Sequence, residues 1–195
     1  MSKNLYVIAG AEGSGKTTFI KNLLESGWFP ETPVINVDLL AETLDKNLSG
    51  AEKTKLATEM CKSSMTKLAE QKKTFILEAP FSERSEFAVL KSFKAFGYAI
   101  HTVYLATSVP VINERRIKKR AAITGEAEMK DFRDKYRKSM RNIKQLIEIS
   151  TNILIYDCSD ENLKKVYAKT DSGEEWIDQR YKVISWVNEY IPNVL

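Results

Sequence analysis

The stretch Gly10-Ala11-Glu12-Gly13-Ser14-Gly15-Lys16-Thr17 decides the fold, because it follows the apolar run 5–9 and precedes the helix-like residues 18–25. It fits the pattern G-x-x-x-x-G-K-[ST] of the phosphate-binding P-loop. Such a loop curls its backbone N–H groups around a polyphosphate, a path that side chains at its glycines would obstruct. We therefore predict an ATP site formed by Gly10, Ala11, Glu12, Gly13, Ser14, Gly15, Lys16, Thr17 and Thr18. Lys16 would reach the β- and γ-phosphates, and the Thr17 hydroxyl would bind Mg²⁺.

Composition is that of an ordinary globular domain. The 195 residues are 43% hydrophobic and 29% charged, which is enough apolar material for one core and favours a single domain over residues 1–195. The net charge of +4 suits a partner that carries phosphates, large or small. A nucleic-acid-binding protein would more often have a denser surplus of Lys and Arg.

Cysteine and histidine are too sparse for a zinc site or a disulfide framework. Cys61 and Cys158 are far apart in sequence, and the single His101 lies in an apolar, strand-like run, which favours a packed or edge histidine. Residues 5–10 are too short for the apolar region of a signal peptide, and nothing approaches a transmembrane span. We expect no membrane association and a reducing, cytoplasmic location.

Strand-like and helix-like segments alternate after the P-loop. Short apolar strands are predicted at 34–37, 74–77, 98–106 and 152–156, with helices at 17–26, 39–47, 51–71 and 82–96 between them. This order predicts an α/β fold with a doubly wound parallel sheet, of the P-loop NTPase type found in nucleotide and shikimate kinases. An edge strand at 163–169 and an amphipathic closing helix at 174–190 would follow.

Leu48-Ser49-Gly50-Ala51, before the helix that runs to about residue 71, invites comparison with the signature loop of transporter ATPases, while Ser49-Gly50-Ala51-Glu52 has the pattern of a capping box. That loop would need a second glycine and a glutamine that are missing here, so a capping box is the better interpretation. The packed stripe of this helix is predicted to be Leu56, Met60, Met65 and Leu68.

Two acids follow predicted strands at the edge where open α/β sheets bind ligands. Asp38 follows the strand at 34–37, and Glu78 follows the strand at 74–77 in the place of a Walker-B acid. Asp38 is our candidate for the base that accepts a proton from the substrate hydroxyl, with a helix N-cap as the alternative. Glu78 would hold Mg²⁺ through water, or hold the substrate, and the alternative is a strand-end acid without a ligand.

An arginine-bearing segment, about 108–149, follows the fourth predicted strand. Its first helix opens at Ser108-Val109-Pro110, ends near Gly125 and carries Arg116 and Arg120 on one face. The second, about 127–149, has an apolar face formed by Met129, Phe132, Tyr136, Met140, Ile143 and Ile147, next to a row formed by Arg133, Arg137 and Arg141. We predict a helical lid whose Arg116, Arg120 and Arg133 contact ATP phosphates and whose Arg137 contacts the substrate. A solvated helix face is the alternative.

The chain resembles the zeta-toxin-like P-loop kinases. The stretches that carry the resemblance are 6–19, Ile35-Asn36-Val37-Asp38, Glu78, 98–105, 116–120, 133–142 and Tyr156-Asp157, so it covers roughly residues 3–158. The toxins of this family phosphorylate UDP-N-acetylglucosamine and are held in check by an antitoxin. The resemblance implies Lys16 and Thr17 for ATP and Mg²⁺, Asp38 as the base, and Arg116, Arg120 and Arg133 as phosphate clamps.

Two departures from the family affect the substrate more than ATP. Where Glu-Thr-Thr is expected, the chain has Glu78-Ala79-Pro80, which removes hydroxyls that could hold a substrate. Where relatives often carry Gly-Gly-His, it has Ile123-Thr124-Gly125.

We thus expect an ATP- and Mg²⁺-dependent kinase that phosphorylates a hydroxyl of a nucleotide sugar such as UDP-N-acetylglucosamine, with an antitoxin as a candidate partner. The alternatives are a polynucleotide or nucleoside kinase, so nucleic acid is not excluded as a partner, and a regulatory module that binds ATP without transferring phosphate. A GTP switch is disfavoured because the chain has no Asn-Lys-x-Asp motif.

Overall fold

A computed structural model describes residues 3–27, 29, 31–124, 131–160, 162–182 and 184–192. The strands are β1 (Asn4–Ala9), β2 (Val34–Ile35), β3 (Phe75–Ala79), β4 (Ala99–Ala106), β5 (Asn152–Asp157), β6 (Lys164–Lys169) and β7 (Glu175–Ile177). The helices are α1 (Lys16–Glu25), α2 (Val37–Glu42), α3 (Gly50–Glu70), α4 (Arg84–Ala95), α5 (Pro110–Thr124), α6 (Phe132–Arg141), α7 (Ile143–Ile149) and α8 (Ser185–Tyr190), with a short 3₁₀ helix η1 (Gln179–Tyr181).

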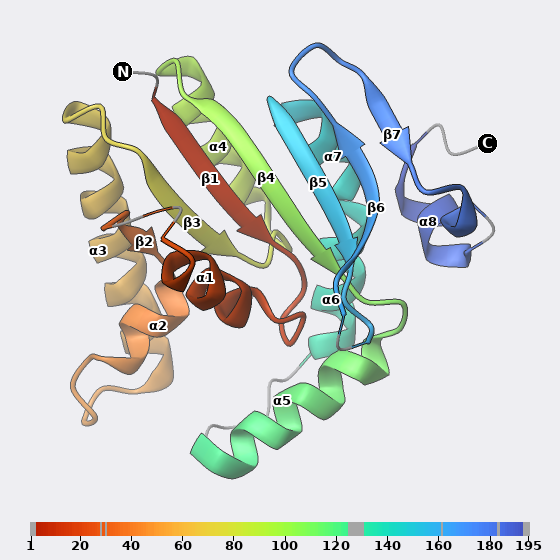
Figure 1. Cartoon of the computed structure of the whole chain (residues 1–195). Coiled ribbons are helices and arrows are strands. Elements are labelled where there is room, and N and C mark those ends of the chain that lie inside the picture. Colours follow the sequence, from red (N-terminus) through yellow and green to blue (C-terminus); the bar gives the residue numbers. More distant parts are fainter. Residues whose placement is uncertain are drawn as a thin grey trace.

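The strands form one sheet in the order β2-β3-β1-β4-β5-β6-β7. The first five strands of this order are parallel, and β6 and β7 join antiparallel at one edge (Figure 1). Because the parallel strands all run one way, their carboxyl ends share an edge, where the P-loop, α2, α5 and α6 lie. The predicted doubly wound P-loop fold is confirmed.

Helices cover the two faces of this sheet unequally. On one face, α3, α4, α6 and α7 build a large apolar core against side chains such as Val7, Phe75 and Tyr104. On the other face, α1 packs Ile20 against Ile8 and Ile76 in a much smaller cluster. None of the helices in the described ranges is long and apolar enough to cross a bilayer.

The capping box at Ser49 is confirmed, since Ser49 and Glu52 exchange hydrogen bonds at the start of α3. The predicted stripe of α3 is wrong in part. The helix buries Ala57, Cys61 and Met65, while Leu56 and Met60 are exposed and Leu68 packs at the margin of the core. The small side chains of Ala57 and Cys61 are the ones that face the sheet, which a search for large apolar residues overlooks.

The predicted closing helix at 174–190 is also wrong. This segment forms β7, η1 and α8, because the turn before it closes a hairpin between β6 and β7. Thr170 N donates to Glu174 O at 3.0 Å, and Gly173 takes the left-handed backbone (φ 85°) that such a turn favours.

The helix predicted at 127–149 is two helices, α6 and α7, which meet at Asn142. Its apolar face is confirmed for the described residues Phe132, Tyr136, Met140, Ile143 and Ile147, while Met129 and Gly125 lie outside them. Because α7 packs behind the sheet, only α5 and α6 of the predicted lid lie at the carboxyl edge (Figure 1).

Candidate active site at the carboxyl edge of the sheet

The P-loop joins β1 to α1, and its glycines are required by the protein's own backbone. A Cβ atom on Gly10 would lie 2.3 Å from the carbonyl oxygen of Leu105 in β4, and one on Gly13 would lie 2.8 Å from the carbonyl oxygen of Asn113 in α5. Both glycines have positive φ. At Gly15 nothing lies within 4 Å. Packing against β4 and α5 therefore requires glycine at positions 10 and 13, and the positive φ of 100° favours glycine at position 15. The predicted obstruction of a polyphosphate by side chains at these positions stays a prediction.

Lys16 is the first residue of α1, and its side chain is buried. Its Nζ donates to the Ala11 carbonyl at 3.3 Å, across the loop. Burial lowers the pKa of the Lys16 amine, and the nearby carboxylates of Glu78 and Glu12 act in the opposite direction. An ammonium in such a place is poorly compensated, so an anion inside the loop would be bound strongly.

Thr17 contacts Glu78 directly. Its hydroxyl donates to Glu78 Oε1 at 2.9 Å, and Glu78 Oε2 is buried without a hydrogen-bond partner among the described residues. The register that pairs Ile8 with Glu78 places the carboxylate beside the strand that leads into the P-loop. Glu78 is the fourth of the five residues of β3 and so lies at the carboxyl end of the strand, as predicted.

These two side chains fit a magnesium ion. Mg²⁺ prefers oxygen ligands, keeps several waters and is usually held by one or two protein side chains together with phosphates. The described residues contain no cluster of three or more metal-binding side chains. The orphaned Oε2 of Glu78 is the oxygen that such an ion or its water would satisfy.

Asp38 lies in the first turn of α2 and is exposed, because β2 ends at Ile35. The predicted strand to residue 37 is therefore too long. Asn36 caps the helix, since its side chain accepts from Leu39 N at 3.1 Å. The alternative role of Asp38 as the N-cap is thus wrong, and its carboxylate is not committed to the helix.

Asp38 lines a cavity of about 100 Å³, called here the central cavity. The P-loop, α2, the loop after β3 and α6 all contribute to it. Its walls are Ala11, Glu12, Asp38, Pro80, Ser82, Phe132, Lys135 and Tyr136. Burial raises the pKa of Glu12, Arg120 lowers it and the charge of Asp38 raises it further. The central cavity therefore brings two carboxylates to the mouth of the P-loop.

Arg116 lies beside the P-loop as predicted. Its guanidinium donates to the carbonyl oxygen of Cys158 at 2.8 Å and to that of Gly13 at 3.5 Å. The side chain is partly buried, so it joins α5 to the P-loop and to the end of β5. Its hydrogen bonds are with backbone carbonyls, one of which, that of Gly13, belongs to the P-loop itself.

The other predicted arginines are more exposed. Arg120 forms an ion pair with Glu12 of the P-loop at 2.9 Å, and Arg133 forms one with Glu114 of α5 at 2.6 Å. Arg137 is exposed and lines neither of the cavities described here. The structure thus brings Arg116 and Arg120 to the P-loop, and binds Arg133 to the neighbouring helix.

Sequence reasoning missed several residues that hold the site together. Asn113 is fully buried, and its Nδ2 donates to the Glu12 carbonyl at 2.6 Å. Ser139 donates to the carbonyl oxygen of Pro80 and accepts from Tyr104 at 2.9 Å, which fixes the loop after β3. Cys158 donates its thiol proton toward the Ser14 carbonyl at 3.2 Å. Asn113 and Ser139 lie in the predicted arginine-bearing segment and Cys158 was noted as a cysteine, but none of the three was predicted to support the site, because single buried polar residues carry no periodic signal.

Residues 5–140 match the model of a protein family described as an AAA domain. The chain belongs to this family. No curated protein matches the chain.

Solved structures share the fold at low sequence identity. One, titled AvrRxo1-ORF1:-ORF2 with ATP, has a TM-score of 0.73 at 13% identity over 94% of this chain and 64% of its own, so the present chain spans about two thirds of its length. A structure from the PezAT chromosomal toxin–antitoxin system of Streptococcus pneumoniae has a TM-score of 0.64 at 19% identity, and the match covers 86% of this chain and 71% of that one. A chain of the Pnkp1/Rnl/Hen1 RNA repair complex has a TM-score of 0.60 at 20% identity, and the match covers 74% of this chain and 47% of that one.

Proposed function

We propose that this protein is a kinase that uses ATP and Mg²⁺ to phosphorylate a hydroxyl of a small acceptor, a nucleotide sugar such as UDP-N-acetylglucosamine. The proposal depends on one observation: Lys16, the Thr17–Glu78 pair and Asp38 meet at the carboxyl edge of the sheet, and the Asp38 carboxylate does not cap α2. A P-loop alone would serve any nucleotide-binding protein. A free carboxylate that faces the loop across a cavity is what transfer to a hydroxyl additionally needs.

One set of residues acts on ATP and its metal ion, and Asp38 acts on the acceptor hydroxyl. Lys16, Arg116 and Arg120 surround the P-loop with positive charge, which stabilises the charge that develops on the γ-phosphoryl oxygens. Asp38 accepts the proton of the attacking hydroxyl, and Glu78 and Thr17 supply the oxygens for the metal. Mg²⁺, when bound, neutralises charge on the β- and γ-phosphates.

The comparisons support this proposal at the level of the fold. The similar structures include kinases and an ATP complex, which agrees with an ATP-dependent phosphotransferase. One of them is a structure of AvrRxo1-ORF1 with AvrRxo1-ORF2, and another comes from the PezAT chromosomal toxin–antitoxin system. An antitoxin-like partner and a cytoplasmic location are part of the proposal.

The test is transfer of ³²P from [γ-³²P]ATP to a panel of nucleotide sugars, nucleosides and 5′-hydroxyl oligonucleotides. Asp38→Asn should lower transfer by at least roughly 10²-fold while ATP still binds. The matched control is Glu42→Gln, which changes an exposed acid one turn later on α2 that does not line the central cavity. Wild-type transfer by Asp38→Asn would refute the mechanism.

The panel also separates the alternatives. Labelling confined to oligonucleotides or nucleosides would indicate a polynucleotide or nucleoside kinase. Loss of the γ-phosphate from ATP that no acceptor stimulates, or no loss at all, would indicate a regulatory ATP-binding module.

A further inference from the structure

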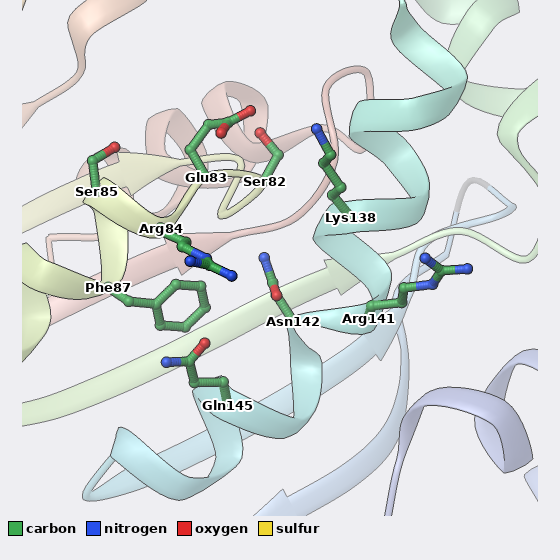
Figure 2. A pocket seen from close by; sticks show the side chains of 9 residues that line it. All are labelled: Ser82, Glu83, Arg84, Ser85, Phe87, Lys138, Arg141, Asn142 and Gln145. Atoms are coloured by element: carbon green, nitrogen blue, oxygen red, sulfur yellow. The ribbon is translucent and has the colours of Figure 1, made fainter.

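A second, larger cavity adjoins the central one. It has a volume of about 500 Å³ and lies between the start of α4 and the junction of α6 with α7 (Figure 2). Ser82 lines both cavities, so the two are neighbours along the loop that follows β3. We call it the outer cavity.

Positive charge predominates around the outer cavity. Three cations, Arg84, Lys138 and Arg141, line it against the single carboxylate of Glu83. In Figure 2 the Arg84 guanidinium points across the cavity toward Asn142, and the Lys138 amine points toward Ser82. Lys138 has an ion-pair partner, Asp134 at 3.0 Å. The guanidinium of Arg84 has no hydrogen bond or ion pair with the described residues.

The remaining walls are apolar and amide surfaces. Phe87 is 3% exposed and forms the base of one side, and Gln145 faces it from α7. Asn142 is fixed, because its Nδ2 donates to the Phe81 carbonyl at 2.8 Å. A guanidinium, an aromatic wall and amides in one concave site are suited to a molecule that carries both phosphate and a planar or sugar group.

Volume decides how a substrate can be placed. Ligand pockets for small molecules hold about 300–1,000 Å³, so the central cavity of about 100 Å³ accepts little more than the reacting hydroxyl and its neighbours. Any acceptor of nucleotide size must extend elsewhere. The outer cavity is the adjoining space of sufficient size.

We propose that the outer cavity binds the diphosphate-bearing part of the acceptor, with Arg84 as its principal anion ligand, while the acceptor hydroxyl lies beside Asp38. This inference rests on the proposed kinase function. It makes the acceptor a nucleoside diphosphate derivative and assigns its recognition to α4 and α6.

The test is calorimetric titration of UDP into the full chain after the P-loop has been saturated with a non-hydrolysable ATP analogue and Mg²⁺. UDP should bind, and uridine should bind at least about tenfold more weakly, because charge-assisted hydrogen bonds to phosphate are lost. Arg84→Gln should weaken UDP binding at least about tenfold. The control Lys91→Gln, an exposed cation of the same helix outside the cavity, should leave it unchanged.

Other outcomes overturn the inference. It is wrong if UDP does not bind, if UDP and uridine bind alike, or if Arg84→Gln binds UDP as the wild type does while the ATP analogue still binds. A 5′-hydroxyl oligonucleotide that binds more tightly than UDP and depends on Arg84 would instead assign the cavity to nucleic acid. Binding requires no phosphoryl transfer, so failure of the kinase assay with Arg84-dependent UDP binding intact would refute the proposed function alone.

Discussion

The two sides of the candidate site are built differently. The donor side, around the P-loop, is held by hydrogen bonds to backbone carbonyls. Asn113 donates to the Glu12 carbonyl, Arg116 donates to the Cys158 carbonyl, and the Cys158 thiol donates to the Ser14 carbonyl. The acceptor side is a pair of cavities lined by side chains from α2, α4, α6 and the loop after β3. The donor side is therefore built around one short motif, whose backbone is held by residues of α5 and by the residue that follows β5. The acceptor side is assembled from distant segments and can change its chemistry without changing the fold.

The largest effect on stability is expected from adding a methyl group to Gly10, on the donor side. Gly10→Ala places Cβ 2.3 Å from the Leu105 carbonyl at a φ of 138°, so both the P-loop and β4 must shift. We expect a loss of roughly 3 kcal/mol in the free energy of unfolding, measured by urea denaturation. Gly15→Ala is the matched control, because Gly15 also has a positive φ (100°) but its Cβ would meet nothing within 4 Å, so the difference between the two variants reports the clash with β4.

If Gly15→Ala is as destabilising as Gly10→Ala, packing against β4 is not what makes Gly10 necessary. If instead Gly15→Ala loses clearly less stability than Gly10→Ala but also loses ATP affinity, the division between a packing glycine and a ligand-facing glycine holds.

Lys16→Met separates binding from stability. It should reduce ATP affinity by at least roughly 10²-fold in calorimetry, because the cation inside the loop is lost. Burial lowers the pKa of Lys16, so the charged form destabilises the folded state at every pH below that lowered pKa. Without nucleotide, the variant should therefore melt at the wild-type temperature or a few degrees higher near pH 7. A lower melting temperature without ATP would show that the ammonium stabilises the empty loop.

The same division explains what could be predicted from the sequence. The P-loop, the parallel sheet and the buried face of α6 and α7 follow from local patterns, since each is a short motif or a regular apolar period. The position of Asp38 was less predictable, because Asn36 competes with it for the cap and shortens β2. The outer cavity could not be predicted, because Arg84, Phe87 and Asn142 come together only through the packing of α4 against α6 and α7.

Arg116 tests whether the donor side also supplies catalysis. Its guanidinium already binds three backbone carbonyls, so Arg116→Ala should lower kcat by roughly 10- to 100-fold and leave ATP binding less affected. Arg116→Lys keeps the charge but loses the fork geometry, so it should recover only part of the rate. A kcat within about twofold of wild type for Arg116→Ala would reduce the residue to an anchor of α5.

Glu12 links the two sides, since it belongs to the P-loop and also lines the central cavity. Its raised pKa means that the folded state binds its proton more tightly than the unfolded state. Its contribution to stability is therefore present at low pH and is lost as pH rises from its ordinary value through the raised one. Glu12→Gln should remove this dependence, so its melting temperature relative to wild type should rise between about pH 4 and 7. A parallel pH profile for the two proteins would show that the Arg120 pair offsets the burial of Glu12.

Arg133 should have the smallest effect, although its spacing with Arg137 and Arg141 predicted a phosphate clamp. It forms an exposed ion pair with Glu114, with 62% and 26% of the two side chains accessible, and such pairs contribute little to stability. Arg133→Ala should therefore leave the melting temperature within about one degree and kcat/KM for ATP within about twofold. Glu114→Gln is the informative partner, because it frees the guanidinium without removing it. If Arg133→Ala lowers kcat at least tenfold while Glu114→Gln is fully active, Arg133 leaves Glu114 and contacts the nucleotide during the reaction, and the donor side extends onto α6.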